Sequence, residues 1–329
     1  MQETRVKIAF VILHYLLFEE TKKAIESIRE NCDTEDYRIV VVDNASPNDS
    51  FNELTLSYAD DKNVKLIRNE KNLGFARGNN VGFRYARDHY DPNFIVMINN
   101  DIYVVEKHLY EKLNAEYKKS GFALAGVRID RKGSVAADKP IYVIPTIAHC
   151  NYGIREMNER LFWMHFGLYE KVCPFLRKIY NKLHIFQQPV RPAAGIYEGD
   201  ANILSKAYDV GAHGCCLIFS RKFIQKYDGL HEGTFMYGEE IILFTQMLCN
   251  GERTVYMPEI IMFHAHGMST NEAKKGISKN KRLLQWTKAD LCSYKILKKI
   301  LVDYKNTHGK ELHEAWADNT KNCKDTLFS

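Results

Sequence analysis

The sequence feature that most constrains the fold is an unbroken apolar run at residues 94–98, followed at once by Asn99, Asn100 and Asp101. Five consecutive apolar residues are typical of a strand that is buried on both faces of a parallel sheet. In open α/β sheets, ligands bind beyond the carboxyl ends of such strands. We therefore expect Asp101 to present a carboxylate to a ligand or a metal ion. The alternative is a plain polar turn, which Asn-Asn-Asp also suits.

Strands and helices alternate through the first hundred residues. Apolar runs predict strands over residues 7–13, 37–42, 64–68 and 94–98, and amphipathic periodicity predicts helices over residues 18–29 and 75–88. This pattern indicates an α/β fold with a doubly wound, mostly parallel sheet. The second strand also ends on a carboxylate, Asp43, so we expect polar strand ends to gather at one edge.

The later part of the chain gives weaker signals. Helices are predicted over residues 110–119, 220–227 and 241–249, and strands over 123–129, 215–219 and 255–263, the last broken at Pro258. Residues 131–205 lose periodicity, and we expect short helices there that form a lid or binding surface. The aromatic stretch 160–180 suits either core packing or a platform that stacks on sugars.

Positive charge is concentrated near the C-terminus. The chain has a net charge of +5, yet residues 1–130 hold 18 Lys and Arg against 21 Asp and Glu, whereas residues 273–329 hold 13 against 6. Residues 273–305 are interpreted as a basic amphipathic helix or helix pair. Such a segment either packs on the domain or makes a peripheral contact with a membrane surface.

Cysteine usage and hydropathy indicate the compartment. The eight cysteines include no CxxC pair, which favours buried thiols in a reducing environment. The longest apolar run, residues 8–18, is too short to span a bilayer, and acidic residues follow it instead of a cleavage site. We expect a cytoplasmic protein, possible contact at the inner face of the membrane being left open, and no nucleic-acid partner.

Three groups of residues can carry chemistry. Asp101 and His264 both follow apolar runs, and a carboxylate with an imidazole suits Mn²⁺ or Mg²⁺ when phosphate oxygens fill the other positions. Glu240 has a like-charged neighbour in Glu239, which raises the basicity of one of the two. The loop at residues 69–80 offers glycines, amides and Arg77 to an anionic ligand. The chain has neither GxGxxG nor a Walker A motif.

Five short motifs occur in order along the chain. They are VVDNAS at residues 41–46, NLGFARGNN at 72–80, INND at 98–101, YGEE at 237–240, and His264 with Ser269 five residues on. This series resembles the GT-A glycosyltransferases of family 2, in the rhamnosyltransferase-like branch of bacterial polysaccharide synthesis. The resemblance covers residues 6–270, and it fades in residues 131–205 and after about residue 275.

The resemblance implies a GT-A-like α/β domain over residues 1–270, with an acceptor-side insertion at 131–205, and a basic helical C-terminal extension over 271–329. It implies an inverting, metal-dependent transfer of a hexosyl or rhamnosyl unit from a nucleoside diphosphate donor, linked to uridine or deoxythymidine. The acceptor would be a glycan, either lipid-linked or protein-linked, in cell-surface polysaccharide or glycoconjugate synthesis.

The resemblance also implies roles for residues at matching positions. The implied nucleotide contacts are Asp43, Asn44, Asn72, Gly74, Arg77, Asn79, Asn99 and Asn100. The implied metal ligands are Asp101 and His264, the catalytic base is Glu240 or its neighbour Glu239, and the acceptor contacts are His213 and Tyr237. The chain departs from the family pattern at Asn99 and Glu240, where Asp is more frequent, and at Ile242, where the family often has Asp.

Each assignment has a structural alternative. Asp43 could cap a helix entry, Glu240 could be a solvated acid stabilised by the helix dipole, and Arg77 could be a surface residue. His264 could be a structural histidine, with His266 as the replacement ligand. Two rival functions remain: a non-catalytic subunit that binds nucleotide or glycan as a scaffold, and a sugar-nucleotide pyrophosphorylase, which would need a glycine-rich basic loop after the first strand.

Overall fold

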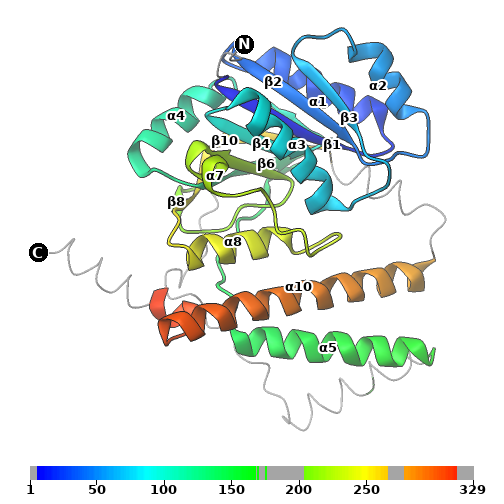
Figure 1. Cartoon of the computed structure of the whole chain (residues 1–329), viewed down its shortest axis with the longest axis vertical. Helices are drawn as coiled ribbons and strands as arrows, with labels where there is room; N and C mark the ends of the chain where they lie inside the picture. The colour runs from blue at the N-terminus through cyan, green and yellow to red at the C-terminus, as the bar shows by residue number, and fades with distance from the viewer. Residues whose placement is uncertain (1–5, 168, 170–174, 176–203, 266–277, 317–329) are drawn as a thin grey trace, which may run out of the picture. The chain divides into compact units, whose positions relative to one another are not determined.

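A computed structural model describes residues 6–167, 169, 175, 204–265 and 278–316. The chain divides into two compact units, residues 1–141 with 202–275 and residues 142–201 with 276–329. The sheet belongs to the first unit (Figure 1). The segment predicted as a C-terminal extension therefore shares its unit with part of the predicted insertion. Each unit is described by itself below.

The described strands form one sheet with the order β3-β2-β1-β4-β9-β6-β10-β5, to which β7 adds beside β6 and β8 beside β10. Strands β3, β2, β1 and β4 run parallel, as do β6 and β10, while β9 and β5 are antiparallel to their neighbours. This confirms the α/β fold with a mostly parallel sheet. The strands are β1 (Ile8–His14), β2 (Tyr37–Asp43), β3 (Val64–Arg68), β4 (Phe94–Asn99), β5 (Ile102–Val104), β6 (Leu124–Arg131), β7 (Ser134–Asp138), β8 (Ala207–Tyr208), β9 (Cys216–Ser220) and β10 (Thr254–His264).

Helices cover both faces of this sheet (Figure 1). One face carries α1 (Phe18–Asn31), α2 (Ser50–Tyr58) and α4 (Leu109–Ser120), and the other carries α3 (Phe75–Tyr90), α7 (Arg221–Lys226) and α8 (Glu239–Cys249). Along β1, Ile8 and Phe10 enter the first core, whereas Ala9 enters the second. Because both faces are buried, the strands are apolar without interruption, as the sequence shows.

Helix α3 lies unusually close to the strands because one of its inward positions is a glycine. A Cβ atom at Gly82 would lie 2.5 Å from Cγ1 of Val11 and 3.0 Å from Cγ2 of Val42. The helix backbone therefore rests directly on β1 and β2. This contact fixes the height of α3 above the sheet, and with it the loop that precedes the helix.

The second unit contains the helices α5 (Ile147–His165) and α10 (Lys279–His308). They pack together where a Cβ at Gly153 would lie 2.5 Å from the Tyr294 ring. The sequence predicted short helices here, but α5 has 19 residues. Its buried positions, Cys150, Gly153 and Met157, follow helical spacing, but a cysteine and a glycine give this face only a weak apolar signal. Among the described residues, no helix is long and apolar enough to cross a membrane.

Strand β10 corrects a smaller expectation. It continues through Pro258 as one strand of 11 residues, and its pairing with β6 shifts register between Met257 and Ile261. The proline, which lacks a backbone N–H, interrupts the ladder rather than the strand.

Replacing Gly82 with alanine tests the contact between α3 and the sheet. In an ordinary helix this change is stabilising by roughly 0.5–1 kcal/mol, but overpacking against Val11 and Val42 should reverse the sign and cost about 1–3 kcal/mol. Urea unfolding of the single variants Gly82→Ala and Val11→Ala and of the double variant measures the coupling. A stabilised Gly82→Ala protein would show that α3 does not rest on the strands at this point.

Candidate active site

The carboxyl ends of three parallel strands meet at one edge of the sheet. In the β1–β2 pair His14 lies opposite Asp43, and in the β1–β4 pair Leu13 lies opposite Asn99. Strand β10 joins them through β5, because His264 pairs with Ile102 next to Asp101. The expected gathering of polar strand ends at one edge is therefore present.

Asp43 is fully buried at the end of β2. Its carboxylate accepts a hydrogen bond from the Ser46 backbone N–H, at 3.1 Å, and lies 3.2 Å from Nε of Arg68. Arg68 ends β3, directly opposite Asp43, and our sequence analysis gave it no role. The rule that strand ends gather at one edge could have identified it. Asp43 does not cap α2, whose N-cap position is Asp49.

His14 supports Asp43 from the neighbouring strand. Its Nδ1 lies 2.6 Å from Oγ1 of Thr21, and its Nε2 lies 2.9 Å from Oγ of Ser50 and 4.0 Å from Oδ1 of Asp43. Burial lowers the pKa of His14 to about 4, although the Asp43 carboxylate opposes this shift. At neutral pH the imidazole is therefore uncharged, and it ties the starts of α1 and α2 to β1.

Asn44 holds the loop of residues 69–74. Its Nδ2 donates to Oδ1 of Asn72 at 3.0 Å and to the Gly74 carbonyl at 3.1 Å, and its Oδ1 accepts from Nδ2 of Asn69 and from the Leu73 N–H. Both donor hydrogens of this buried amide are thus used inside the protein. Asn44 was predicted as a nucleotide contact, but its side chain instead holds the loop that carries Asn72.

Three other predicted nucleotide contacts, Gly74, Arg77 and Asn79, lie at the start of α3. Gly74, at the N-cap, has φ of +81°, and a Cβ there would lie 2.3 Å from the Phe235 carbonyl oxygen, so only glycine fits. The exposed Arg77 donates from Nε to the Glu232 carbonyl at 2.9 Å. Asn79 is buried, with Nδ2 donating to the Phe75 carbonyl, and its Oδ1 has no hydrogen-bond partner in the described part of the chain.

The Asn99-Asn100-Asp101 segment is tied to neighbouring elements by hydrogen bonds from Asn99 and Asn100. The Asn99 backbone N–H donates to the Cys215 carbonyl at 3.1 Å. Asn100 is buried and donates from Nδ2 to Oγ1 of Thr21 at 3.2 Å, so it joins β4 to α1.

Asp101 and His264 form a buried pair. His264 Nε2 lies 3.5 Å from Oδ2 of Asp101, and the Ala265 N–H donates to the Asp101 carbonyl at 2.9 Å. A carboxylate oxygen and an imidazole nitrogen suit Mn²⁺, and less closely Mg²⁺. Within the described ranges no cluster of three or more His, Cys, Asp or Glu side chains could hold a metal, so a cation here would need ligand oxygens from elsewhere. His266, the replacement ligand, lies outside the described residues.

The two glutamates at the start of α8 differ in accessibility. Glu239 is 3% exposed, and burial, with the Glu240 charge as a smaller contribution, raises the pKa of its carboxyl group. Glu240 is half-buried, and a Cβ at Gly214 would lie 3.3 Å from its Oε2. Glu240 therefore faces the turn of residues 213–215, and Glu239 faces the protein interior.

The predicted acceptor contacts flank Glu240. His213 lies next to Gly214, and its Nδ1 is 3.0 Å from Sγ of Cys215. Tyr237 has φ of +76°, rare for a residue with a side chain, and Gly238 follows with φ of +84°. Such strain is stored mainly at functional sites. The turn at 213–215 thus touches Glu240 through Gly214 and Asn99 through Cys215.

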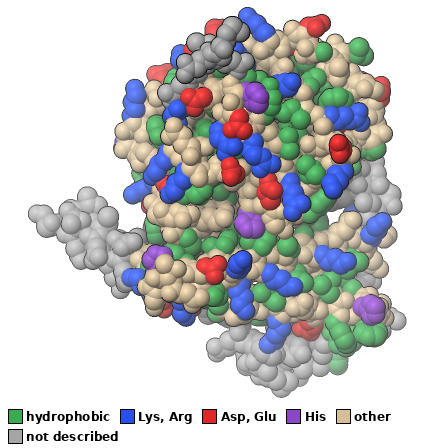
Figure 2. Space-filling model, in the orientation of Figure 1, with side chains coloured by type: hydrophobic (Ala, Val, Ile, Leu, Met, Phe, Trp, Pro, Cys, Tyr) green, Lys and Arg blue, Asp and Glu red, His purple; other side chains and the backbone are tan. Residues whose placement is uncertain are grey.

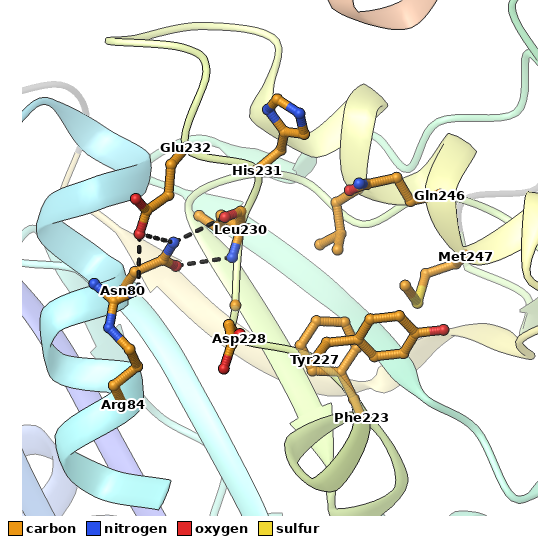
Figure 3. A pocket seen from close by; sticks show the side chains of 12 residues that line it. Asn80, Arg84, Phe223, Tyr227, Asp228, Leu230, His231, Glu232, Gln246 and Met247 are labelled. Atoms are coloured by element: carbon orange, nitrogen blue, oxygen red, sulfur yellow. Dashed lines mark hydrogen bonds and ion pairs between the residues drawn. The ribbon is translucent and has the colours of Figure 1, made fainter. Parts of the chain in front are cut away.

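A cavity of about 360 Å³ lies elsewhere, between α3, α7 and α8 (Figure 3). None of the predicted site residues lines it. Its polar lining includes Asn80 and Arg84, which both bind Glu232, and its apolar lining includes Phe223 and Met247. Asn80 belongs to the NLGFARGNN motif but had no predicted role, and neither did Glu232. Their partners are about 150 positions away along the chain.

Comparison with known proteins shows the family of the chain. The family model described as glycosyl transferase family 2 matches residues 10–184, more than half of the chain. A comparison with curated proteins found no match. Among solved structures, GalNAc-T7 with UDP, GalNAc and Mn²⁺ is 13% identical with a TM-score of 0.57, over 96% of this chain and 56% of that one. The chain thus spans little more than half the length of that protein.

Two further solved structures are similar at lower scores. TarS 1–349 of S. aureus is 12% identical with a TM-score of 0.49, over 92% of this chain and 72% of that one. The mannosyltransferase PcManGT from Pyrobaculum calidifontis, in complex with GDP-Man and Mn²⁺, is 12% identical with a TM-score of 0.47, over 98% and 81%. At 13% identity, the likeness to GalNAc-T7 supports the fold. With its family match over more than half of its length, the chain belongs to glycosyl transferase family 2.

Proposed function

We propose that this chain is an inverting, metal-dependent glycosyltransferase that moves a sugar from a nucleoside diphosphate donor to a glycan acceptor. The observation that carries the proposal is the buried Asp101–His264 pair at the carboxyl edge of the sheet. A carboxylate and an imidazole that converge without a third protein ligand in the described residues suit a cation completed by diphosphate oxygens. Family membership supports the same reaction class.

Residues around this pair would hold the donor. Asn72, Arg77, Asn79 and Asn99 lie on the loop, the helix and the strand end that surround the edge. Asp43, Asn44 and Asn100 would act by shaping the site, because their side chains already bind other parts of the protein, and Gly74 would do so because only glycine fits its position. Arg77 and Asn79 also hydrogen-bond within the protein, but Arg77 is exposed and Asn79 Oδ1 has no partner in the described part of the chain. When bound, Mn²⁺ or Mg²⁺ would offset the negative charge that builds on the leaving diphosphate. We propose a uridine- or deoxythymidine-linked hexose or rhamnose as donor, as in the rhamnosyltransferase-like branch.

Glu240 is the proposed catalytic base. Its carboxylate would take the proton of an acceptor hydroxyl as that oxygen bonds to the anomeric carbon, while the bond from this carbon to the diphosphate oxygen breaks. A single displacement inverts the anomeric centre, and proton transfer to a positioned base contributes about 10²–10⁴-fold. Contact of the 213–215 turn with both Glu240 and Asn99 supports a base next to the donor, with His213 and Tyr237 beside the acceptor.

The acceptor would be a lipid-linked or protein-linked glycan in cell-surface polysaccharide or glycoconjugate synthesis. A cytoplasmic protein with this task would work at the inner membrane face, and we propose that residues 273–305 make a peripheral contact there. Blue Lys and Arg side chains spread along α10 (Figure 2), and Trp286 is 46% exposed on the same helix. Basic helices with exposed aromatic residues bind anionic bilayer surfaces.

One observation favours a second candidate, a non-catalytic subunit that binds nucleotide or glycan. Asn99 supplies an amide where the family often has a carboxylate, which leaves Asp101 as the one acidic group of the motif. Ile242, another departure, is fully buried on α8 and offers no ligand atom. No observation favours the pyrophosphorylase alternative.

Nucleotide binding should depend on metal and on Asp101. A ligand present at about 100 times its Kd stabilises the folded state by roughly 2.7 kcal/mol. In a thermal-shift panel of uridine, deoxythymidine and guanosine diphosphates, one nucleotide should raise the Tm only with Mn²⁺, and Asp101→Asn should remove this shift. The exposed Asp88→Asn variant is the matched control and should keep it. A shift that is equal without metal would rule out this site.

Replacing each of the two glutamates with glutamine should affect the rate of donor hydrolysis to different extents. Glu240→Gln should lower the rate of donor hydrolysis by about 10²–10⁴-fold, because the proton acceptor is lost, while the nucleotide-dependent thermal shift stays. Glu239→Gln should change the rate much less, since burial already favours the neutral form of that carboxyl group. The opposite ranking of the two variants would transfer the base assignment to Glu239.

Membrane contact should depend on the charge of α10. Replacing the exposed Lys279, Lys281 and Lys288 with glutamine should weaken sedimentation with anionic phosphatidylglycerol vesicles, by about 1 kcal/mol for each lysine near the surface. The binding should also fall with added salt. The control replaces Lys62, Lys65 and Lys71, exposed in the sheet-containing unit, in the same way. Equal loss in both variants, or no vesicle binding by the wild type, would contradict the contact.

A further inference from the structure

The segment that carries the chain into α8 depends on other elements for its position. Residues 228–238 contain neither helix nor strand, and Glu239 and Glu240 follow directly. Backbone N–H and C=O groups in such a segment need partners wherever they are shielded from water. Several of these partners come from α3, whose start carries the donor-side loop.

Asn80 of α3 makes the most specific of these contacts (Figure 3). It is 1% exposed; its Nδ2 donates to the Leu230 carbonyl at 2.8 Å, and its Oδ1 accepts from the Leu230 N–H at 2.8 Å. The same Nδ2 donates to Oε1 of Glu232 at 3.1 Å. One side-chain amide therefore pairs with both backbone groups of Leu230, as a neighbouring strand would.

The segment is shaped to receive this amide. Gly229 has φ of +107°, and a Cβ at this position would lie 2.3 Å from Oδ1 of Asn80. A side chain at residue 229 would both strain the backbone and displace the amide. The glycine and the asparagine thus fit each other across 149 residues of sequence, the difference between positions 229 and 80.

The start of α3 holds the same segment further along. The Phe75 N–H donates to the Phe235 carbonyl at 2.7 Å, directly after Gly74, whose missing side chain leaves room for that carbonyl. Arg77 donates to the Glu232 carbonyl. Arg84 pairs with the Glu232 carboxylate at 2.7 Å, but both side chains are more than a third exposed, so that ion pair adds little.

We propose that Asn80 is a positioning residue that couples the donor-side loop, residues 69–74, to the segment that places Glu240. The loop ends where α3 begins, and α3 hydrogen-bonds to the segment at Leu230, Glu232 and Phe235. A nucleotide that orders the loop would thereby also fix the start of α8. The inference rests on the proposed function for the roles of the loop and of Glu240, and it adds a residue that contacts neither donor nor acceptor.

Hydrogen–deuterium exchange of the full chain tests the coupling without requiring catalysis. Uridine diphosphate with Mn²⁺, or deoxythymidine diphosphate if only that one raises the Tm, should slow exchange in residues 69–74 and also in residues 229–240. In Asn80→Ala the protection of 69–74 should remain and that of 229–240 should be lost. Asn80→Asp keeps the acceptor for the Leu230 N–H and serves as a second variant if the alanine protein folds poorly.

The control variant is Arg87→Met. Arg87 lies on the same helix and pairs with Asp228 of the same segment at 2.5 Å, but Asp228 is 82% exposed. This variant should keep both protected regions. Hydrolysis of the matching nucleoside diphosphate glucose should fall about tenfold to a hundredfold in the Asn80 variants, the cost of a displaced catalytic group, with unchanged nucleotide affinity, and it should stay near wild type in Arg87→Met.

The outcomes separate this inference from the proposed function. If nucleotide protects residues 69–74 of the wild type but leaves 229–240 unchanged, the coupling is wrong and the proposed donor site stands. The coupling is also wrong if the Asn80 variants lose nucleotide affinity and activity in parallel, as a purely structural role predicts. A wild-type protein that binds none of the nucleotides would overturn the proposed function and the coupling together.

Discussion

The parallel register of β1 with β2 and β4 is the constraint on which the site depends. It sets His14 opposite Asp43 and Leu13 opposite Asn99, so that three polar strand ends stand at one edge. Packing on the two faces fixes this register, because a slip by one residue would exchange large side chains such as Phe10 in the first core with small ones such as Ala9 in the second. The antiparallel β5–β10 pair then brings His264 to Asp101, completing the proposed metal site.

Two buried asparagines fix the loops that adjoin this edge of the sheet. The side-chain amide of Asn44 hydrogen-bonds to the loop of residues 69–74, and the side-chain amide of Asn80 hydrogen-bonds to the backbone of Leu230. Asn80 is part of α3, which is held against the sheet at Gly82. A loop fixed by buried hydrogen bonds is expensive to rearrange, since an unpaired buried group costs roughly 1–3 kcal/mol. The proposed donor side and base side are therefore parts of one connected framework.

The sequence predicted the sheet well because apolar runs report burial on both faces; the limits of β3 matched at both ends. It also predicted that Asp101 and His264 would meet, since both follow strands. It could not show that Asn44 is used inside the protein, because those bonds join residues 25 to 30 positions apart through loop geometry. The strand-end rule, applied to β3, would have added Arg68 beside Asp43. The length of helix α5 was missed because its regularly spaced buried face includes a cysteine and a glycine, which give a weak apolar signal.

Pulsed electron paramagnetic resonance of bound Mn²⁺ tests the central claim most directly. With uridine or deoxythymidine diphosphate present, the account predicts a ¹⁴N coupling from the His264 imidazole together with ³¹P couplings from the diphosphate. In His264→Ala the ¹⁴N coupling should vanish while the ³¹P couplings remain wherever nucleotide still binds. A wild-type spectrum with ³¹P but no ¹⁴N coupling, or a ¹⁴N coupling that survives in His264→Ala, would place the metal away from the Asp101–His264 pair.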